Sequence, residues 1–212
     1  MFIVVTFINS VFDSNSYLIY KEDLEECYLI DCGDTKPVLD YIKQHCLHLK
    51  AVFLTHTHFD HIYGLNELVE QVPAVTVYTS EFGKMALQSD KLNLSRYNQY
   101  SFVFRYVERI RVLGESEIIR VCGNMVMEAL STPGHDKGCL TYRIGENVFS
   151  GDSFIPGLKV VASFPNSDKL DARTSEQLIR EWARGNNLYP GHGRYYIASV
   201  SYTHLRAHET LR

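Results

Sequence analysis

The sequence predicts a single α/β domain in which a sheet-based core is flanked by helices. Its 212 residues suffice for one substantial core, and 45% hydrophobic with 22% charged residues is ordinary for a globular domain. Segments of strand type interleave along the chain with segments of helical periodicity, and two pairs of strands are joined by short turns. Because neither a linker nor a repeat interrupts this pattern, one core covered by helices is the simplest architecture.

The first quarter of the chain predicts three strands, a helix and a fourth strand. The strands are the apolar runs FIVVTFI, SYLIY, CYLID and AVFLT. The helix is capped by Asp34 or Thr35 and has Pro37 in its first turn. Its apolar face consists of Val38, Ile42 and Cys46.

Two further helices are predicted downstream. One runs from Ile62 to about Glu70, where apolar residues recur at helical spacing and Pro73 lies just beyond the end. The other runs from Thr174 to about Arg184 and ends before Gly185.

Two consecutive β-hairpins are predicted between these helices. The runs EIIRV and MVMEAL flank the turn pair Gly123-Asn124, and LTYRI and VFSGD flank residues 145–147. Apolar runs on either side of glycine- and asparagine-containing turns are typical of hairpins.

Composition limits the partners and the compartment. The formal net charge of −4 gives no polycationic surface, so we expect no nucleic-acid partner. We expect no membrane partner, because no run of about 18 apolar residues occurs. The five cysteines form no C-x-x-C pair, which favours free thiols and a cytoplasmic protein. We also expect the protein to be a monomer or a homodimer.

The end of the chain is set apart from the fold. The stretch VSYTHLRAHET resembles the translation of a sequencing-library adapter. We therefore assign residues 1–199 to one domain and residues 200–212 to a non-native tail. His204 and His208 in this tail are not counted as candidate ligands.

The stretch THTHFDH crowds three of the chain's nine histidines and an aspartate directly after the apolar run AVFL. In extended backbone, side chains two residues apart point the same way, so His56 and His58 can face one point. Asp60 and His61 follow where the strand gives way to the helix, and their side chains can converge on a second point nearby. The spacing therefore indicates metal binding.

Three further candidate ligands lie in glycine-flanked turns at predicted strand ends. They are His135 in TPGHDKG, Asp152 in FSGDSF and His192 in LYPGHG. Glycine lets the backbone approach a site closely, as a ligand-bearing loop requires. A single loop histidine is usually a surface or core residue, but together with HTHFDH these three favour a metal site. Imidazole and carboxylate ligands suit zinc, and also iron or manganese.

Other histidines and cysteines have plainer interpretations. His45, Cys46 and His48 lie near the end of a helix and before a strand, where we interpret them as a helix terminus. Cys139 lies four residues after His135, and we interpret it as a buried thiol and not as a nucleophile.

The motifs THTHFDHIYGL, TPGHDKG, SGDSF and YPGHG, in this order, resemble those of the metallo-β-lactamase fold hydrolases. Among these hydrolases, the motifs look like those of the glyoxalase II (hydroxyacylglutathione hydrolase) branch. The resemblance spans nearly all of residues 1–194 and includes SNSYLI and LIDCGD. It implies an αββα sandwich of two mixed β-sheets flanked by helices, with a two-metal site at one edge.

The resemblance also implies a ligand set for two divalent metal ions, zinc first, with iron or manganese as alternatives. Three histidines would hold the first ion, an aspartate and two histidines the second, and one aspartate would bridge them. In that order these are His56, His58 and His135, then Asp60, His61 and His192, then Asp152.

The implied activity is hydrolysis of S-lactoylglutathione or a related small acyl thioester. Two cations near one water lower its pKa from about 15.7 to about 7, so a bridging hydroxide can attack the acyl carbon. A metal can stabilise the developing oxyanion, and Asp60 is our candidate for an acid/base role. Alternatives are a mononuclear iron persulfide dioxygenase, a lactonase or phosphodiesterase on the same scaffold, and a metal-stabilised interaction module without activity.

Substrate recognition is the part in which the sequence departs from the glyoxalase II pattern. In those relatives a lysine after the bridging aspartate helps to bind glutathione, and Lys159 is the candidate here. Val161 stands where a tyrosine is expected. Asp136, Lys137 and Cys139 also differ from the usual residues after the loop histidine.

Overall fold

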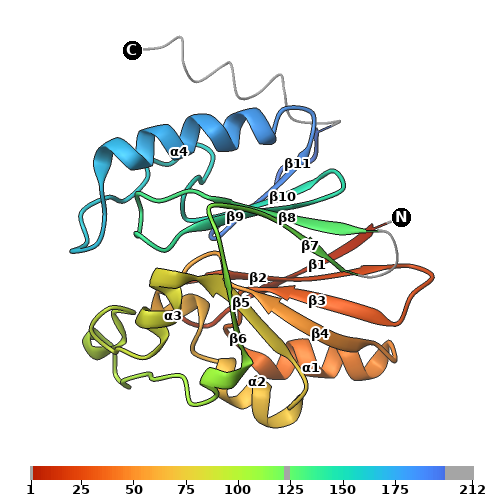
Figure 1. The fold of residues 1–212 in the computed structure, drawn as a ribbon. Helices are drawn as coiled ribbons and strands as arrows, with labels where there is room; N and C mark the ends of the chain where they lie inside the picture. Colours follow the sequence, from red (N-terminus) through yellow and green to blue (C-terminus); the bar gives the residue numbers. More distant parts are fainter. Residues whose placement is uncertain (1, 122–124, 199–212) are drawn as a thin grey trace.

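Two β-sheets lie face to face, and helices cover the outer side of each sheet (Figure 1). This computed structural model describes residues 2–121 and 125–198. The expected tail of residues 200–212 and the turn at Gly123-Asn124 lie outside the described residues. The layer order is helices, sheet, sheet, helix, which confirms the predicted αββα sandwich.

Both sheets are mixed. The first contains three antiparallel strands followed by parallel ones, in the order β1 (Phe2–Ile8), β2 (Asn15–Lys21), β3 (Glu26–Ile30), β4 (His48–Phe53), β5 (Thr76–Ser80) and β6 (Ile110–Leu113). The second pairs one parallel strand with an antiparallel series, in the order β11 (Asn187–Pro190), β10 (Asn147–Gly151), β9 (Leu140–Ile144), β8 (Val126–Ser131) and β7 (Ser116–Arg120). The β7–β8 and β9–β10 pairs are the two predicted hairpins.

Among residues 2–121 and 125–198, four α-helices flank the sheets. The first sheet is covered by α1 (Thr35–Gln44), α2 (Leu65–Gln71) and α3 (Glu81–Leu87), and the second by α4 (Lys169–Trp182). Short 3-10 turns occur at η1 (Phe59–His61), η2 (Ser95–Tyr97) and η3 (Val107–Arg109). No helix in the described part of the chain is long and apolar enough to cross a membrane.

The alternation of strand side chains produces three separate apolar layers. In β2, Leu18 faces the helices, whereas Tyr17 and Ile19 face the second sheet. The layer between the sheets is fully buried around Phe53, Tyr142 and Phe149. A third layer joins α4 to the second sheet through Val148, Phe154, Ile179 and Leu188.

Two helix boundaries and one face differ from the sequence-based expectation. The helix predicted from Ile62 begins at Leu65, after the 3-10 turn η1, because the backbone between them pairs with Cys32: Cys32 N–H donates to the His61 carbonyl and Gly64 N–H donates to the Cys32 carbonyl. The last helix begins at Lys169 and not at Thr174, because the Asp168 carboxylate caps two N–H groups of the first turn.

The face predicted for the first helix is correct for Val38 and Ile42 and wrong for Cys46. The helix ends at Gln44, and Cys46 adopts a left-handed φ of 54° with its side chain exposed. The terminus therefore turns this thiol away from the apolar face.

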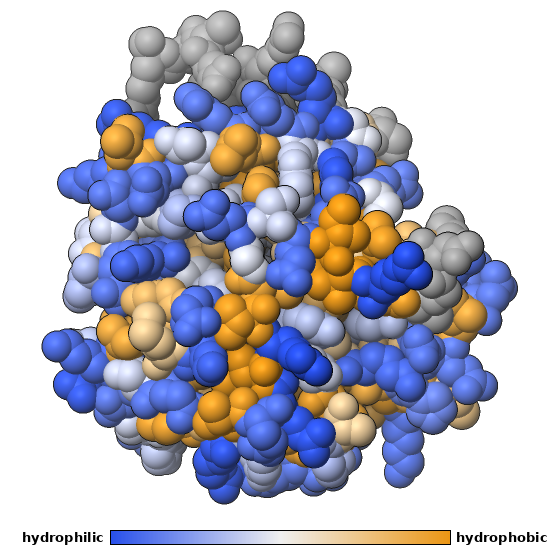
Figure 2. All heavy atoms as spheres, in the orientation of Figure 1, coloured by the Kyte–Doolittle hydropathy of each residue, from blue (hydrophilic) through white to orange (hydrophobic). Residues whose placement is uncertain are grey.

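One face of the molecule carries an exposed apolar band over β6 and β7, shown in Figure 2. Val112 of β6 is 37% exposed and Ile118 of β7 is 67% exposed. An exposed apolar band is a surface that a second copy of the chain could cover. The expected choice between monomer and homodimer stays a prediction.

Candidate metal centre

Four strands end at one edge of the sandwich, and the segment after each strand carries candidate ligands. The segments follow β4, β8, β10 and β11. The two sheets are joined here, because Leu140 N–H donates to the Thr55 carbonyl and Tyr142 Oη donates to the Leu54 carbonyl. All seven side chains that the sequence singled out as ligands come together at this edge: His56, His58, Asp60, His61, His135, Asp152 and His192.

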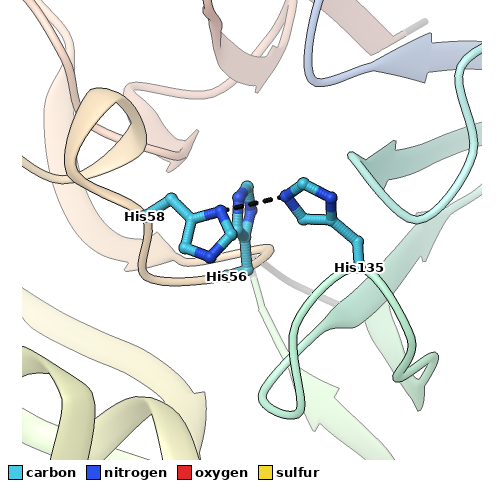
Figure 3. Close-up of side chains that lie close together, drawn as sticks. All are labelled: His56, His58 and His135. Atoms are coloured by element: carbon cyan, nitrogen blue, oxygen red, sulfur yellow. Dashed lines mark hydrogen bonds between the residues drawn. The ribbon is translucent and has the colours of Figure 1, made fainter. Parts of the chain in front are cut away.

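The first group consists of the three rings in Figure 3, which converge from the β4 and β8 segments. The candidate ligand atoms of His56, His58 and His135 all lie within 4.8 Å of one another, and all three side chains are buried. The closest pair is His58 Nδ1 and His135 Nε2, 2.9 Å apart.

In each of these two rings the proton is assigned to the nitrogen that faces away from the other ring. His135 Nδ1 donates to the Val161 carbonyl at 2.9 Å, so in the neutral ring Nε2 carries the lone pair. His58 Nε2 lies 3.6 Å from the Asp136 carboxylate, which favours the proton on that nitrogen and the lone pair on Nδ1. Two lone pairs that face each other repel unless a cation lies between them. The pair therefore fits metal coordination.

The second group consists of Asp60, His61 and His192, whose ligand atoms also lie within 4.8 Å of one another. Asp60 Oδ2 lies 3.3 Å from His61 Nε2 and 3.3 Å from His192 Nε2. The two imidazole nitrogens are 3.3 Å apart. Three ligand atoms of a second site thus face one point.

Asp152 lies between the two groups. Its Oδ2 is 3.5 Å from His135 Nε2 in the first group and 3.4 Å from His192 Nε2 in the second. Its Oδ1 is 3.6 Å from His61 Nε2. A carboxylate in this position can contact ions at both sites at once.

The charges of the two groups differ. Burial lowers the pKa of His56 and His135, so both rings stay neutral and available as ligands. In the second group burial acts in the same direction, but the Asp60 and Asp31 carboxylates outweigh it and raise the pKa of His61 to about 9. The carboxylates Asp152 and Asp60 likewise raise the pKa of His192 to about 10. His61 and His192 of the second group are therefore protonated and positively charged when no metal is bound.

The donor set fits a pair of divalent ions on two observations. His56 Nε2 and Asp152 Oδ1 are buried and have no hydrogen-bond partner among the described residues. An unsatisfied buried polar atom costs about 1–3 kcal/mol, so such atoms are rare without a ligand. Imidazole with carboxylate and no thiolate is a donor set that zinc, iron and manganese all accept.

Four of the five histidines also have a hydrogen-bond partner at the second ring nitrogen, and the fifth, His58, has a carboxylate 3.6 Å from it, which the residue types alone do not predict. Two acceptors are backbone carbonyls, at Val161 for His135 and at Phe12 for His192. The others are side chains: Thr55 for His56, Asp136 for His58 and Asp31 for His61. Asp31 lies in the LIDCGD motif, so the sequence carried a signal for it, whereas no side-chain pattern marks a carbonyl. These contacts orient the rings.

The segment after β10 covers one side of the first group. The Phe164 ring packs edge-on against His58 and His135, with ring centroids 5.1 Å and 5.6 Å apart. Ser167 Oγ donates to the His135 carbonyl at 2.6 Å. Lys159, the predicted substrate residue, lies in the same segment and lines a pocket instead of contacting the ligands.

The remaining predictions for single residues are also tested by the structure. Cys139 is buried, and burial raises the pKa of its thiol well above the ordinary value, so the thiol is inert as predicted. His45 and His48 belong to no group of candidate ligands in the described part of the chain.

Fold and site together place two adjoining groups of candidate metal ligands at one edge of an αββα sandwich. The family model for the "Metallo-beta-lactamase superfamily" matches residues 9–200. The chain therefore belongs to the metallo-β-lactamase superfamily, as the sequence motifs indicated. The glyoxalase II branch is a finer assignment that this match does not make.

Several solved structures are similar over most of the chain. One is BLEG-1, described as a B3 metallo-beta-lactamase, with 22% identity, a TM-score of 0.83 and coverage of 96% of this chain and 97% of that one. TTHA1623 in a di-iron-bound form has 25% identity, a TM-score of 0.77 and coverage of 93% and 96%. ETHE1 from Myxococcus xanthus has 26% identity, a TM-score of 0.70 and coverage of 91% and 76%. The likeness to BLEG-1 supports the fold alone.

Proposed function

We propose that the chain is a metal-dependent hydrolase of small acyl thioesters, such as S-lactoylglutathione. The observation that carries the proposal is the position of Asp152, whose Oδ2 lies 3.5 Å from one group of ligands and 3.4 Å from the other. Such a bridging carboxylate supports two ions close enough together to act on one water. The motifs that resemble glyoxalase II support a thioester as the substrate.

Each ion is assigned to one group of ligands. His56, His58 and His135 would hold the first, Asp60, His61 and His192 would hold the second, and Asp152 would be shared between them. Zinc is the first choice, with iron or manganese as alternatives, and the di-iron form of TTHA1623 supports iron in this fold.

The residues of the chain have separate roles in this hydrolysis. When bound, the two ions supply a water of lowered pKa and stabilise negative charge on the acyl oxygen. Asp60 turns Oδ2 toward both imidazoles, which leaves Oδ1 to accept a proton from the attacking water and to return it to the leaving thiolate. Phe164 covers His58 and His135 and excludes bulk water from that side.

The proposal is tested by metal analysis and thioester turnover on one sample purified without added metal. We expect about two equivalents of metal per chain and hydrolysis of S-lactoylglutathione. The variants His58→Ala and Asp152→Ala should lose turnover and metal together. A metal-replete, fully active variant of either kind would refute the site assignment, and absence of any thioester turnover in the wild type would refute the substrate class.

A second candidate is a mononuclear iron persulfide dioxygenase, which the likeness to ETHE1, a persulfide dioxygenase, favours. It requires one equivalent of iron, with the second group of ligands left without metal. Oxygen consumption on glutathione persulfide with little thioester hydrolysis would select it. A lactonase or phosphodiesterase on the same scaffold would instead show turnover on those esters in the same screen.

A further inference from the structure

β1 forms an open edge of the first sheet. It pairs with β2 on one side, and among residues 2–121 and 125–198 no strand pairs with its other side. Asn9 N–H donates to the Ser14 carbonyl at 2.8 Å, in register with the β1–β2 pair, so the odd-numbered residues of β1 direct their N–H and C=O groups toward β2. The N–H and C=O groups that point outward therefore belong to the even-numbered residues, Phe2, Val4, Thr6 and Ile8.

Within the described part of the chain, the outer edge of β1 carries none of the features that normally protect an edge strand. Those features are charged side chains, proline, a bulge, a very short strand or a covering segment. β1 has the sequence FIVVTFI, without charge or proline, and its register with β2 is continuous. An apolar edge of this kind is a template for pairing with another strand.

Each of the other sheet edges has a protecting feature. β11 is covered, because Leu188 and Tyr196 exchange backbone hydrogen bonds of 2.8 Å. β6 carries Arg111, and β7 carries Glu117 and Arg120, all with exposed side chains. The exposed apolar band over β6 and β7 therefore lies on charged edge strands, whereas β1 offers an uncharged one.

β1 is complementary to a second copy of itself. In an antiparallel pair with its two-fold axis at Val5, each outward-pointing residue lies opposite another one, so all the outward N–H and C=O groups gain partners. The side-chain pairs across the axis are then Phe2 with Ile8, Ile3 with Phe7, Val4 with Thr6, and Val5 with Val5. Aromatic and β-branched pairs of this kind stabilise antiparallel sheets, and no like charges are opposed.

We propose that two copies of the chain form a dimer by antiparallel pairing of β1 with β1, which joins their first sheets into one continuous sheet. This interface adjoins the metal centre, because β1 leads directly into the turn of residues 9–14. In that turn the Phe12 carbonyl accepts a hydrogen bond from His192 Nδ1 at 3.1 Å, and Ser14 Oγ donates to the Asp60 carbonyl at 2.7 Å. The second copy thus supports the turn that holds two ligands of the second group.

The molar mass of the zinc-loaded chain, measured by light scattering over a dilution series, tests the dimer. We expect wild type to approach twice the 24.4 kDa of one chain as the concentration rises. The test variant is Thr6→Pro, which removes an outward N–H and leaves the β1–β2 hydrogen bonds intact. The control is Ile118→Pro, which removes an outward N–H from β7, because the neighbouring hydrogen bonds to β8 are made by Glu115 and Val121.

Thr6→Pro should weaken dimerisation at least about tenfold, because the two-fold axis removes two hydrogen bonds at once. Ile118→Pro should leave dimerisation unchanged. A wild type that stays monomeric at every concentration would overturn the proposal. A dimer that both variants weaken equally, that neither weakens, or that only Ile118→Pro weakens would also overturn it.

A second pair of variants repeats the comparison without changing the backbone. Ile8→Lys and Ile118→Lys replace side chains that are 70% and 67% exposed, positions at which the single chain tolerates a charge. Ile8→Lys should weaken the dimer, because it places a charge opposite Phe2 of the second copy, and Ile118→Lys should not. Equal effects of the two lysines, or an effect of Ile118→Lys alone, would contradict an interface at β1.

Oxidation of single-cysteine variants tests the register. Val5→Cys places two thiols opposite each other at the axis, in a pair without hydrogen bonds whose Cβ atoms lie about 4.5–5.5 Å apart. The control, Ile3→Cys, separates the two thiols by about 14 Å along the strands. Both variants also carry Cys46→Ser and Cys122→Ser, so that the buried cysteines are the only native ones left. A covalent dimer should form with Val5→Cys and not with Ile3→Cys, and any other pattern would overturn this pairing.

Discussion

His61 Nδ1 lies 2.9 Å from Asp31 Oδ2, and both side chains are fully buried. Asp31 reaches this position from the end of β3 with a left-handed φ of 55°. Its two oxygens also accept hydrogen bonds from Thr55 N–H and Oγ1, each at 2.7 Å. One carboxylate thus fixes both the start of the histidine segment and the ring of a second-group ligand.

Asp31→Asn should lower the affinity for the ion at the second group about 10–100-fold, the usual effect of losing a carboxylate that contacts a ligating histidine. Asparagine tolerates the left-handed backbone, so the fold should persist. The affinities of both ions for metal-stripped protein are measured by competition with a chelator. Equal losses at the two sites would indicate general destabilisation and contradict this role for Asp31.

Asp136→Asn should instead lower the affinity for the ion at the first group. Asp136 is 1% exposed, and its Oδ2 lies 3.6 Å from His58 Nε2, while Oδ1 accepts the Gly138 N–H bond at 2.8 Å. Asparagine keeps the second contact and removes the charge that polarises His58. We expect about a tenfold loss of first-ion affinity with the second unchanged. The same competition assay checks it, and an unchanged first site would refute it.

Gly191→Ala should displace the bridging carboxylate. A Cβ at this position would lie 2.0 Å from Asp152 Oδ1 and 3.1 Å from His61 Cε1. Because a displacement of about 1 Å at a reacting centre lowers rates about 100-fold, turnover should fall by at least that factor and metal content should drop.

The control for this variant is Gly185→Ala. Gly185, unlike Gly191, has a positive φ of 76°, and its added Cβ meets no atom within 4 Å. It should lose about 1–2 kcal/mol of stability through the left-handed backbone and keep its full metal content. Parallel loss of metal in both variants would show that a general loss of stability, and not contact with Asp152, is responsible.

Removal of metal should destabilise the folded chain. Without ions, His56 Nε2 and Asp152 Oδ1 remain buried without partners among the described residues. Ligands at about 1,000 times their Kd contribute about 4 kcal/mol each, so chelation should lower Tm by about 10 °C or more. Differential scanning calorimetry before and after chelation, and after zinc is added back, measures this. A Tm that chelation leaves unchanged would contradict a structural contribution from bound metal.

The layers and the ligand set could be predicted from the sequence because their signals are local. A continuous apolar run marks a strand with two buried faces, as in β2, and HTHFDH places four candidate ligands on one short segment. The glycines beside His135, Asp152 and His192 mark the loops that bring distant ligands to the same edge.

The parts that could not be predicted depend on contacts between distant segments. The Phe12 and Val161 carbonyls orient histidines 180 and 26 residues away, and a carbonyl has no residue type to recognise. The start of α4 depended on a capping aspartate ahead of a polar first turn, where helical periodicity gives little signal. The pocket that Lys159 lines likewise forms between two segments that carry no joint motif.

The hydrogen bonds of the Asp34 carboxylate make the stability of the fold depend on pH. Its carboxylate accepts hydrogen bonds from Ser10 N–H at 2.8 Å, Ser10 Oγ at 3.0 Å and Tyr63 Oη at 2.6 Å. Burial alone would raise the pKa of Asp34, but the hydrogen bonds from Tyr63 and Ser10 outweigh it and hold the pKa below 3.8. The charged form is therefore the one that the fold stabilises.

Because the folded pKa is lowered, the stabilisation is fully present above the ordinary pKa of 3.8 and is lost as the pH falls through the folded value. Asp34→Asn should thus lower the free energy of unfolding by about 1 kcal/mol at pH 7, with the difference closing toward pH 3. Denaturant unfolding of metal-stripped protein at stepwise pH measures both chains, with Asp23→Asn, an exposed carboxylate, as the control. A difference that stays constant down to pH 3 would show that Asp34 acts through shape alone and not through its charge.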